Sequence, residues 1–322
     1  MLALAALGRE GSPITAVVVG DERLVYAEAE RAKIAASRLV RVASPEAIEG
    51  LARGAIGWYA ASTKLRSRVR PGKPSKAGGA AQLAWIDEAL ALVVSGACGG
   101  LVTAPASKAS IAASGARGAS RFRGHTEHLA SLLRAPHVVM AFANARMATA
   151  LVTTHLPLRK VPRAITPAGV TLACLELEAL LERLGHDEPR IAVAGLNPHA
   201  GEGGLLGDEE SRLIVPGMVE ACERAAAEDR TIRLAGPIGA ESAFRLAASG
   251  VYQGVVAMYH DQATIACKLM GFGELVNVTL GLPIVRTSVD HGTAYDLAGT
   301  GKASCDGMRA ALTLGDLLAR AA

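Results

Sequence analysis

Short apolar runs that break abruptly into polar residues are the strongest constraint on how this chain folds. The clearest run is Val255 to Met258, which Tyr259, His260 and Asp261 follow directly. Runs of this length without alternation predict strands buried on both faces, as in parallel sheets. Similar runs lie at Ile14 to Val19, Gly99 to Val102, Val138 to Ala141, Thr149 to Thr153, Arg190 to Ala194 and Val276 to Leu282. Because segments with helical patterns separate many of these runs, the sequence predicts an α/β fold.

Length and composition narrow the class of protein. The chain has 322 residues, more than one hydrophobic core usually holds, so we expect two lobes. The formal net charge is +4, but Lys and Arg form no basic stripe and are not interleaved with aromatics, so we expect no nucleic-acid partner. The five cysteines show no CxxC spacing and read as reduced thiols. We find no signal peptide and no apolar run of roughly 18 to 20 residues, and we expect a cytoplasmic protein without a membrane partner.

Three histidines follow the ends of short apolar runs. They are His155, His199 and His260. The ends of parallel strands lie side by side at one edge of a sheet, where ligands of α/β proteins bind. Three imidazoles that converge there could hold a divalent metal and leave one coordination position open for substrate. Their wide spacing is not a local metal motif, so each histidine could instead be a hydrogen-bonded structural residue.

A second set of residues indicates an anion site. Its members are cations and amides near glycine turns at the ends of elements, and Arg286 could bind a carboxylate or phosphate with two hydrogen bonds. Lys268 lies in an apolar helix and could merely extend its amine to water. No GxGxxG follows the first apolar run, so the ordinary Rossmann phosphate loop is absent. The set comprises Lys108, His125, Thr126, Lys268, Asn277 and Arg286.

Five separated motifs resemble the 4-hydroxythreonine-4-phosphate dehydrogenases of pyridoxal phosphate synthesis and their close paralogues. The motifs are GHTEHLA from Gly124, VTTHLPLR from Val152, GLNPHAGEGG from Gly195, MYHDQ from Met258 and GLPIVRTSVDHGTAYDLAG from Gly281. The similarity extends from about Val102 to the C-terminus. It implies an isocitrate and isopropylmalate dehydrogenase-like fold, with two lobes around a parallel or mixed sheet and a central cleft. It also implies a homodimer whose active site is shared across the interface.

The resemblance assigns a role to each candidate residue. It implies that the three histidines bind a divalent metal such as zinc, magnesium or cobalt. His125, Thr126, Lys268, Asn277 and Arg286 match positions that hold a small phosphorylated substrate. The segment His291, Gly292, Thr293 and Ala294 is similar to the loop that holds NAD or NADP in the wider superfamily. We place residues 1–120 and 280–322 in the lobe with this loop, and residues 121–279 in the lobe with metal and substrate residues and the dimer interface.

The implied activity is metal-dependent oxidation and decarboxylation of a phosphorylated 3-hydroxy acid with NAD(P), foremost 4-phosphohydroxy-L-threonine. The segment Gln262 to Lys268, QATIACK, departs from what we expect of the biosynthetic enzyme. Paralogues act on 4-phospho-D-threonate or erythronate, or on carboxylated aromatic cis-dihydrodiols. The retained phosphate-binding set favours a phosphorylated substrate over a dihydrodiol. The sequence assigns no general base.

The start of the chain also departs from the family. The family begins with a strand and a GDPxGIGPE-like turn, which has no counterpart here, and Leu2 to Leu7 reads as the end of a helix. We interpret this as a misassigned start codon. The alternative is an inactive ligand-binding relic without the first strand. An acyl-phosphate transferase on a related fold would have no use for three converging histidines.

Overall fold

The computed structural model describes residues 6–7, 14–65, 70–271 and 273–321. Clustering of contacts divides the chain into two compact units. Unit 1 combines Met1–Pro136 with Leu282–Arg320, and unit 2 spans His137–Gly281. The sequence-based division placed residues 121–136 in the second lobe, whereas the structure has them in unit 1. Most of the segment proposed as the end of a helix, Leu2 to Leu7, lies outside the described residues.

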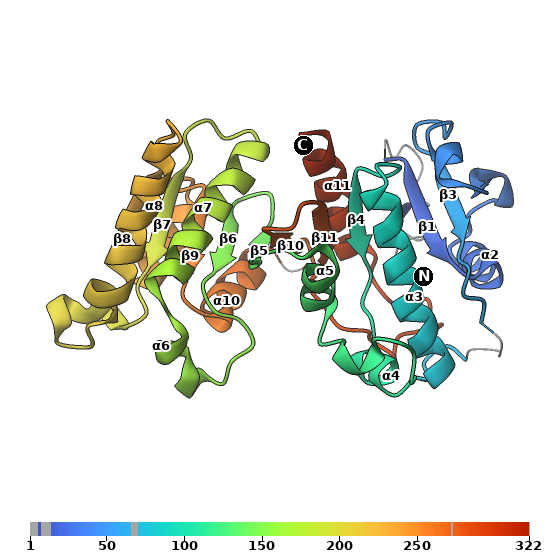
Figure 1. The fold of residues 1–322 in the computed structure, drawn as a ribbon, viewed down its shortest axis with the longest axis horizontal. Helices are drawn as coiled ribbons and strands as arrows, with labels where there is room; N and C mark the ends of the chain where they lie inside the picture. The colour runs from blue at the N-terminus through green and yellow to red at the C-terminus, as the bar shows by residue number, and fades with distance from the viewer. Residues whose placement is uncertain (1–5, 8–13, 66–69, 272, 322) are drawn as a thin grey trace. The chain divides into compact units, whose positions relative to one another are not determined.

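Unit 1 contains two sets of parallel strands (Figure 1). The strands β1 (Ala16–Gly20), β2 (Leu39–Val42) and β3 (Ile56–Ala60) form a sheet in the order β1-β3-β2, while β4 (Gly100–Thr103) pairs in parallel with β11 (Val285–Val289). The helices of this unit are α2 (Glu22–Arg31), α3 (Lys76–Val94), α4 (Lys108–Ala112), α5 (His125–Leu133) and α11 (Asp306–Arg320), with short 3-10 turns at Ala36–Arg38, Pro45–Ile48 and Ala119–Arg121.

Helix α3 is long and apolar enough to cross a membrane by length and composition, as is a bent pair of helices at Leu158–Ala164 and Pro167–Arg183. The Ser75 hydroxyl caps α3 by accepting a hydrogen bond from the Gly78 amide at 3.0 Å. Leu83 and Leu90 on this helix are buried and pack in the core of unit 1. Its apolar character therefore has an explanation within the folded unit.

Unit 2 is built around six strands in the order β10-β5-β6-β9-β7-β8. The antiparallel strands β10, β5 and β6 form one part, and β6, β9, β7 and β8 run parallel. The strands are β5 (Val139–Ala143), β6 (Ala148–Leu151), β7 (Arg190–Ala194), β8 (Arg233–Ile238), β9 (Gly254–Ala257) and β10 (Val276–Leu280). The helices are α6 (Val161–Ala164), α7 (Pro167–Arg183), α8 (Val215–Ala227), α9 (Ala240–Ala248) and α10 (His260–Met270), with short turns at Leu158–Lys160, Pro198–Gly204 and Glu210–Ile214.

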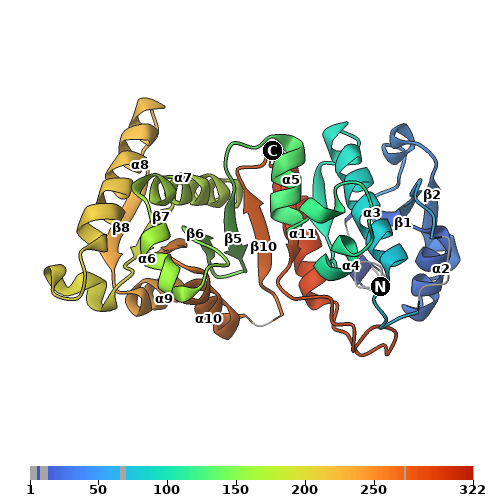
Figure 2. The same cartoon turned by 60° about the horizontal axis from the view of Figure 1, so that its bottom comes forward.

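Helices cover both faces of the unit 2 sheet. In Figure 2, α7 lies on one side of the strands and α10 on the other. A Cβ at Gly254 would contact Leu177 and Leu181 of α7, whereas Val255 packs in the cluster that contains Cys267 of α10. This alternation of faces explains why the strand Gly254–Ala257 is buried throughout.

The structure confirms the predicted α/β fold, and the apolar runs from Val138 and from Thr149 form the antiparallel pair β5 and β6. Three local features near the N-terminus differ from what the sequence pattern indicates. The helical composition of Pro45 to Arg53 predicts a helix, but the structure has only a short 3-10 turn at Pro45–Ile48. The segment Ser62 to Ala80, read as a loop, enters α3 at Lys76. The strands β2 and β3 were missed because their sequences, LVRV and IGWYA, are short and carry an exposed arginine or a glycine.

Candidate active site

The three candidate metal ligands follow three neighbouring parallel strands of unit 2. Strand β9 pairs with β6 on one side and with β7 on the other. His155 follows β6, His260 follows β9, and His199 follows β7. The expected placement of these histidines at one edge of a parallel sheet is therefore observed.

His155 and His260 form a close pair. Their ring centroids are 5.4 Å apart, and the His260 ring packs against the edge of buried Phe142, with centroids 6.2 Å apart. The Nδ1 of His260 lies 2.8 Å from Oδ1 of Asp261. A carboxylate can only accept from a ring N–H, so this contact favours the tautomer with its lone pair on Nε2. Nε2 is thus the nitrogen suited to bind a metal.

His199 lies on an exposed turn with left-handed backbone, at φ 52° and ψ 30°. Among the described residues of one chain, no group of three His, Cys, Asp or Glu side chains is arranged to hold a metal ion. The structure therefore brings two of the three histidines together and places the third on a neighbouring strand end.

Asn277 and Lys268 belong to the same part of unit 2 as His260. Asn277 is the partner of Phe142 in the antiparallel pairing of β10 with β5, so both side chains project from one face of the sheet. Helix α10 packs on this face, because Thr149 of β6 and Cys267 of α10 are in contact at 3.5 Å. Lys268 is the next residue of that helix and is partly buried.

The remaining members of the anion set lie in unit 1. The Arg286 side chain is 4% exposed, and its Nη2 donates a hydrogen bond to Oγ1 of Thr103 at 2.7 Å. Burial lowers the pKa of Arg286 to about 10, while the nearby Glu127 carboxylate acts in the opposite direction. A buried cation is costly unless a charge of opposite sign accompanies it. The Glu127 carboxylate supplies part of that compensation.

His125 begins α5, and Thr126 is the second residue of this helix. Partial burial lowers the pKa of His125 to about 3, and the positive charges of Arg286, His128 and Lys108 add to this effect. A Cβ at Gly124 would lie 3.5 Å from Nζ of Lys108 and 2.7 Å from the Glu127 carboxylate. These residues therefore form one cationic cluster at the N-terminus of α5, a position that favours anions.

The pKa of His125 predicts a loss of stability in acid. Because its folded pKa lies below the ordinary 6.5, neutral His125 stabilises the fold above pH 6.5, and this contribution is lost as pH falls toward 3. Relative to His125→Gln, the wild type should lose about 2 kcal/mol more between pH 7.5 and pH 5, measured by urea unfolding. The exposed His186→Gln variant is the matched control. An equal loss in the wild type and His125→Gln would contradict this prediction.

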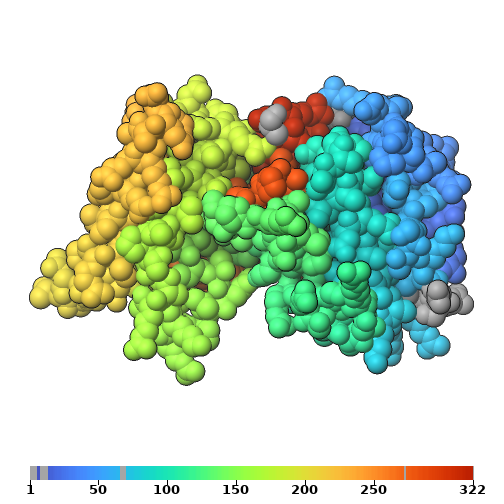
Figure 3. Space-filling model, viewed as in Figure 1, coloured from blue at the N-terminus to red at the C-terminus, as the bar shows by residue number. Residues whose placement is uncertain are grey.

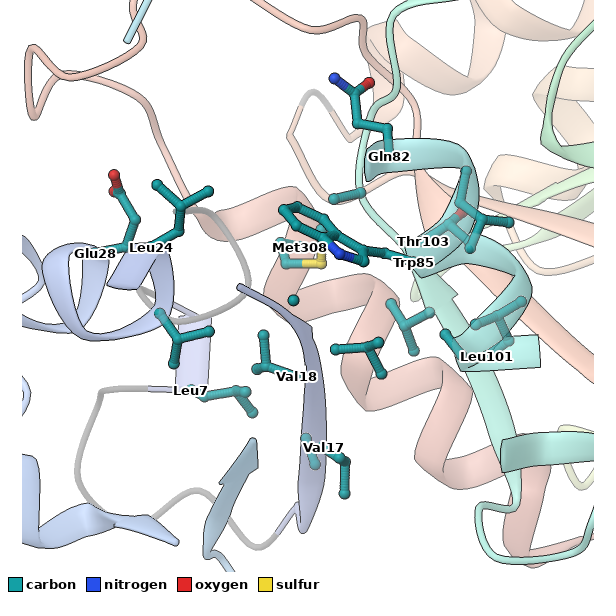
Figure 4. A pocket seen from close by; sticks show the side chains of 18 of the residues that line it. Leu7, Val17, Val18, Leu24, Glu28, Gln82, Trp85, Leu101, Thr103 and Met308 are labelled. Carbon is teal, nitrogen blue, oxygen red and sulfur yellow. The ribbon is translucent and has the colours of Figure 1, made fainter. Parts of the chain in front are cut away.

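The proposed dinucleotide loop, His291 to Ala294, connects β11 to α11. His291 and Gly292 are exposed, and a Cβ at Gly292 would meet no atom of the described residues within 4 Å. Directly after the loop, Tyr295 and Ala298 line a cavity of about 1280 Å³ in unit 1. Figure 4 shows Val17 and Val18 of β1 on one side of this cavity and Leu101 of β4 on the other. Thr103 and His125 also line it, so the cationic cluster opens into this cavity.

Two polar side chains near the histidines were not predicted to matter. Glu210 is buried and accepts hydrogen bonds from the backbone that follows β7. Gln262 connects the backbone after β9 with the backbone after β7. Acidic residues are common at the start of helices, so the sequence alone does not single out Glu210.

Comparison with known proteins identifies the family. The family model described as "Pyridoxal phosphate biosynthetic protein PdxA" matches residues 13–315. The chain belongs to this family. The match begins well before Val102, where the sequence motifs had suggested that the similarity starts.

Known relatives agree over nearly the whole chain. A 4-hydroxythreonine-4-phosphate dehydrogenase of Geobacter metallireducens is 42% identical over 306 residues, covering 94% of this chain and 86% of that protein. A crystal structure of 4-hydroxythreonine-4-phosphate dehydrogenase from Klebsiella pneumoniae superimposes with a TM-score of 0.84 at 32% identity, covering 99% of this chain and 93% of that one. A terephthalate 1,2-cis-dihydrodiol dehydrogenase from Burkholderia xenovorans gives a TM-score of 0.62 at 25% identity, covering 92% and 95%. This PdxA-family chain is a dehydrogenase.

Proposed function

We propose that this PdxA-family enzyme oxidises and decarboxylates 4-phosphohydroxy-L-threonine with NAD or NADP in a metal-dependent reaction in the cytoplasm. The observation that carries the proposal is the arrangement of His155, His260 and His199 after three adjacent parallel strands of a chain that belongs to this family. The relatives named for this substrate supply its identity.

The residues present suit a divalent metal. His155 and His260 are 5.4 Å apart between ring centroids, and the Asp261 contact at Nδ1 orients His260 for binding through Nε2. His155, His199 and His260 would hold the ion, which when bound supplies Lewis-acid polarisation of the substrate hydroxyl and carboxylate. The candidates are zinc, magnesium and cobalt; three imidazole ligands favour zinc or cobalt, because magnesium prefers oxygen ligands.

The anion set would hold the substrate. Arg286 offers a rigid pair of donors to a phosphate, and His125, neutral above pH 6.5, can donate one hydrogen bond without a net charge. Thr126, Lys268 and Asn277 complete the set that the family resemblance assigns.

In the reaction the carbinol carbon gives a hydride to the nicotinamide and the hydroxyl gives up its proton. The C–C bond to the carboxylate then breaks and releases CO2, its electron pair forms an enolate with the new ketone, and the α-carbon takes up a proton. The group that takes the proton is unassigned.

We assign the dinucleotide to the loop His291 to Ala294. Its exposed backbone and the absence of atoms near Gly292 leave space for a ligand to approach closely. The adjoining cavity in unit 1 begins directly after this loop at Tyr295. These features support the assignment and do not distinguish NAD from NADP.

A homodimer that shares the site is part of the proposal. Large apolar side chains are exposed in each segment that carries a candidate ligand, with Leu205 84% exposed after His199 and Leu269 83% exposed on α10. In Figure 3 the green segment after β6 and the yellow segment after β7 both project at the lower edge of unit 2. Exposed apolar groups of this kind mark association surfaces. Because only His155 and His260 lie close together within one chain, a third metal ligand from the partner subunit would complete the site. The exposed large apolar side chains in these segments are Leu156, Leu158, Leu205, Leu206, Ile265 and Leu269.

The second candidate is a dihydrodiol substrate, which the similarity to the terephthalate dihydrodiol dehydrogenase favours. Against it, such a substrate has no phosphate to offer the buried Arg286 guanidinium.

The test is NADH formation by purified protein with 4-phosphohydroxy-L-threonine, 4-phospho-D-threonate and a carboxylated cis-dihydrodiol, each with and without divalent metal. We expect kcat/KM for 4-phosphohydroxy-L-threonine to exceed the other two by at least about 10²-fold. Faster turnover of either alternative would replace the proposed substrate.

A further inference from the structure

The turn that carries His199 has a strained backbone. Three residues without glycine's freedom lie in the left-handed region, with φ of 52° at His199, 52° at Ala200 and 44° at Glu202. Each such residue costs roughly 1 kcal/mol or more. A conformation of this kind persists only where the surroundings hold it in place.

The Glu210 carboxylate holds the segment that leads into this turn. The side chain is 5% exposed, and its Oε1 accepts hydrogen bonds from the amides of Leu196 at 2.9 Å and Asn197 at 2.8 Å. Its Oε2 accepts from Nδ2 of Asn197 at 3.0 Å. Glu210 itself lies in the π-helical turn Glu210–Ile214 that continues into α8. The carboxylate thus connects the residues between β7 and His199, through hydrogen bonds, to the turn that precedes α8.

Two glycines fit closely around this carboxylate. A Cβ at Gly195 would lie 3.1 Å from Oε1 of Glu210 and 2.9 Å from the Cα of Ala200. A Cβ at Gly201, which has φ 82°, would lie 2.8 Å from Oε2. The backbone therefore folds back against the carboxylate on both sides of His199, which leaves the turn little room to move.

Gln262 connects the same backbone to the segment that carries His260. Its Oε1 accepts a hydrogen bond from the Met258 amide at 2.7 Å, and its Nε2 donates to the Gly195 carbonyl at 2.8 Å. The His260 segment and the His199 turn are consequently joined through one amide side chain and one carboxylate.

We infer that Glu210 and Gln262 are positioning residues that fix the His199 turn relative to the strand end bearing His260, before any metal binds. The inference rests on the proposed metal site and deepens it. Buried groups that orient metal ligands without touching the ion typically change metal affinity by 10- to 100-fold when they are removed.

The experiment measures zinc affinity and backbone protection separately. Zinc dissociation constants are obtained by competition with a chromophoric chelator for wild type, Glu210→Met, Gln262→Met and the control Glu209→Gln. Glu209 accepts from the same Asn197 side chain at 2.7 Å but not from the backbone after β7. Hydrogen exchange of residues 195–204 is followed in metal-free protein. Glu210→Met removes the hydrogen bonds from the Leu196 and Asn197 amides and from the Asn197 side chain, and Gln262→Met removes both hydrogen bonds of Gln262. Methionine is similar in volume to both residues that it replaces.

We expect both variants to bind zinc about 10- to 100-fold more weakly than the wild type. The backbone amides of residues 195–204 should also exchange their hydrogens faster in both variants, whereas Glu209→Gln should behave like the wild type in both measurements. Zinc binding as tight as in the wild type for both variants would overturn the inference, even if exchange is faster, because the residues would then be merely structural. A wild type that binds no zinc would instead overturn the proposed metal site. The two failures are therefore distinguishable.

Discussion

Replacing His260 by alanine is expected to lower kcat by about 10³-fold or more and to remove stoichiometric metal from the protein. His260 is the central one of the three proposed ligands, since its strand β9 lies between the strands that precede His155 and His199. Loss of Lewis-acid polarisation costs several kcal/mol of transition-state stabilisation, and each 1.36 kcal/mol is tenfold in rate. The folded protein should survive the change, because the ring is only partly buried.

The control for this variant is Asp261→Asn. Asp261 contacts Nδ1 of His260 at 2.8 Å but is itself largely exposed. The amide can still accept a hydrogen bond, so we expect about 10-fold or smaller losses in metal affinity. Metal content by mass spectrometry under native conditions and initial rates of NADH formation provide the two measurements. A His260→Ala protein that keeps both metal and rate would show that His260 is a structural residue.

Replacing Arg286 by methionine is expected to raise KM for the phosphorylated substrate by about 10²- to 10³-fold. Charged hydrogen bonds contribute about 1.5 to 3 kcal/mol each, and a guanidinium can give two to a phosphate. In the absence of ligand, however, Arg286 is a buried cation whose pKa burial has lowered to about 10. Methionine would also remove the hydrogen bond to Thr103 and the positive charge near Glu127, so we expect the ligand-free variant to melt at a lower temperature than the wild type.

Thermal unfolding with and without the phosphorylated substrate separates the two parts of this prediction. The wild type should melt at a higher temperature when the substrate is present, and Arg286→Met should lose this increase. The control is Arg320→Met, because Arg320 is an exposed residue paired with Asp316 on α11. A variant that melts well below the wild type but keeps its KM would mean that Arg286 supports the fold and does not bind the phosphate.

Much of unit 2 could be predicted from the sequence because its strands are buried on both faces. Such strands appear as apolar runs with sharp ends, so the polar residues that follow them are conspicuous, as at Met258 to His260. The neighbouring positions of the three histidines followed from this pattern. The strands β2 and β3 lacked it, because Arg41 and Gly57 interrupt their apolar character.

The parts of the site that the sequence could not predict depend on contacts between distant residues. The link from Gln262 to the Gly195 carbonyl spans 67 positions, and Glu210 acts on backbone amides 13 and 14 residues before it. A sequence does not reveal which side chain will form a hydrogen bond with a given backbone group. The division of the chain was misjudged at α5 for a similar reason, since His125 belongs with Arg286, which lies far along the chain.

The most direct test of the proposed activity measures two products in metal-stripped protein. The chain is treated with chelator, supplied with 4-phosphohydroxy-L-threonine and NAD, and assayed for NADH and CO2 before and after addition of zinc, magnesium or cobalt. The proposed function predicts no product before metal is added and equal amounts of NADH and CO2 afterwards. Undiminished turnover in the chelated protein, or NADH without CO2, would contradict it.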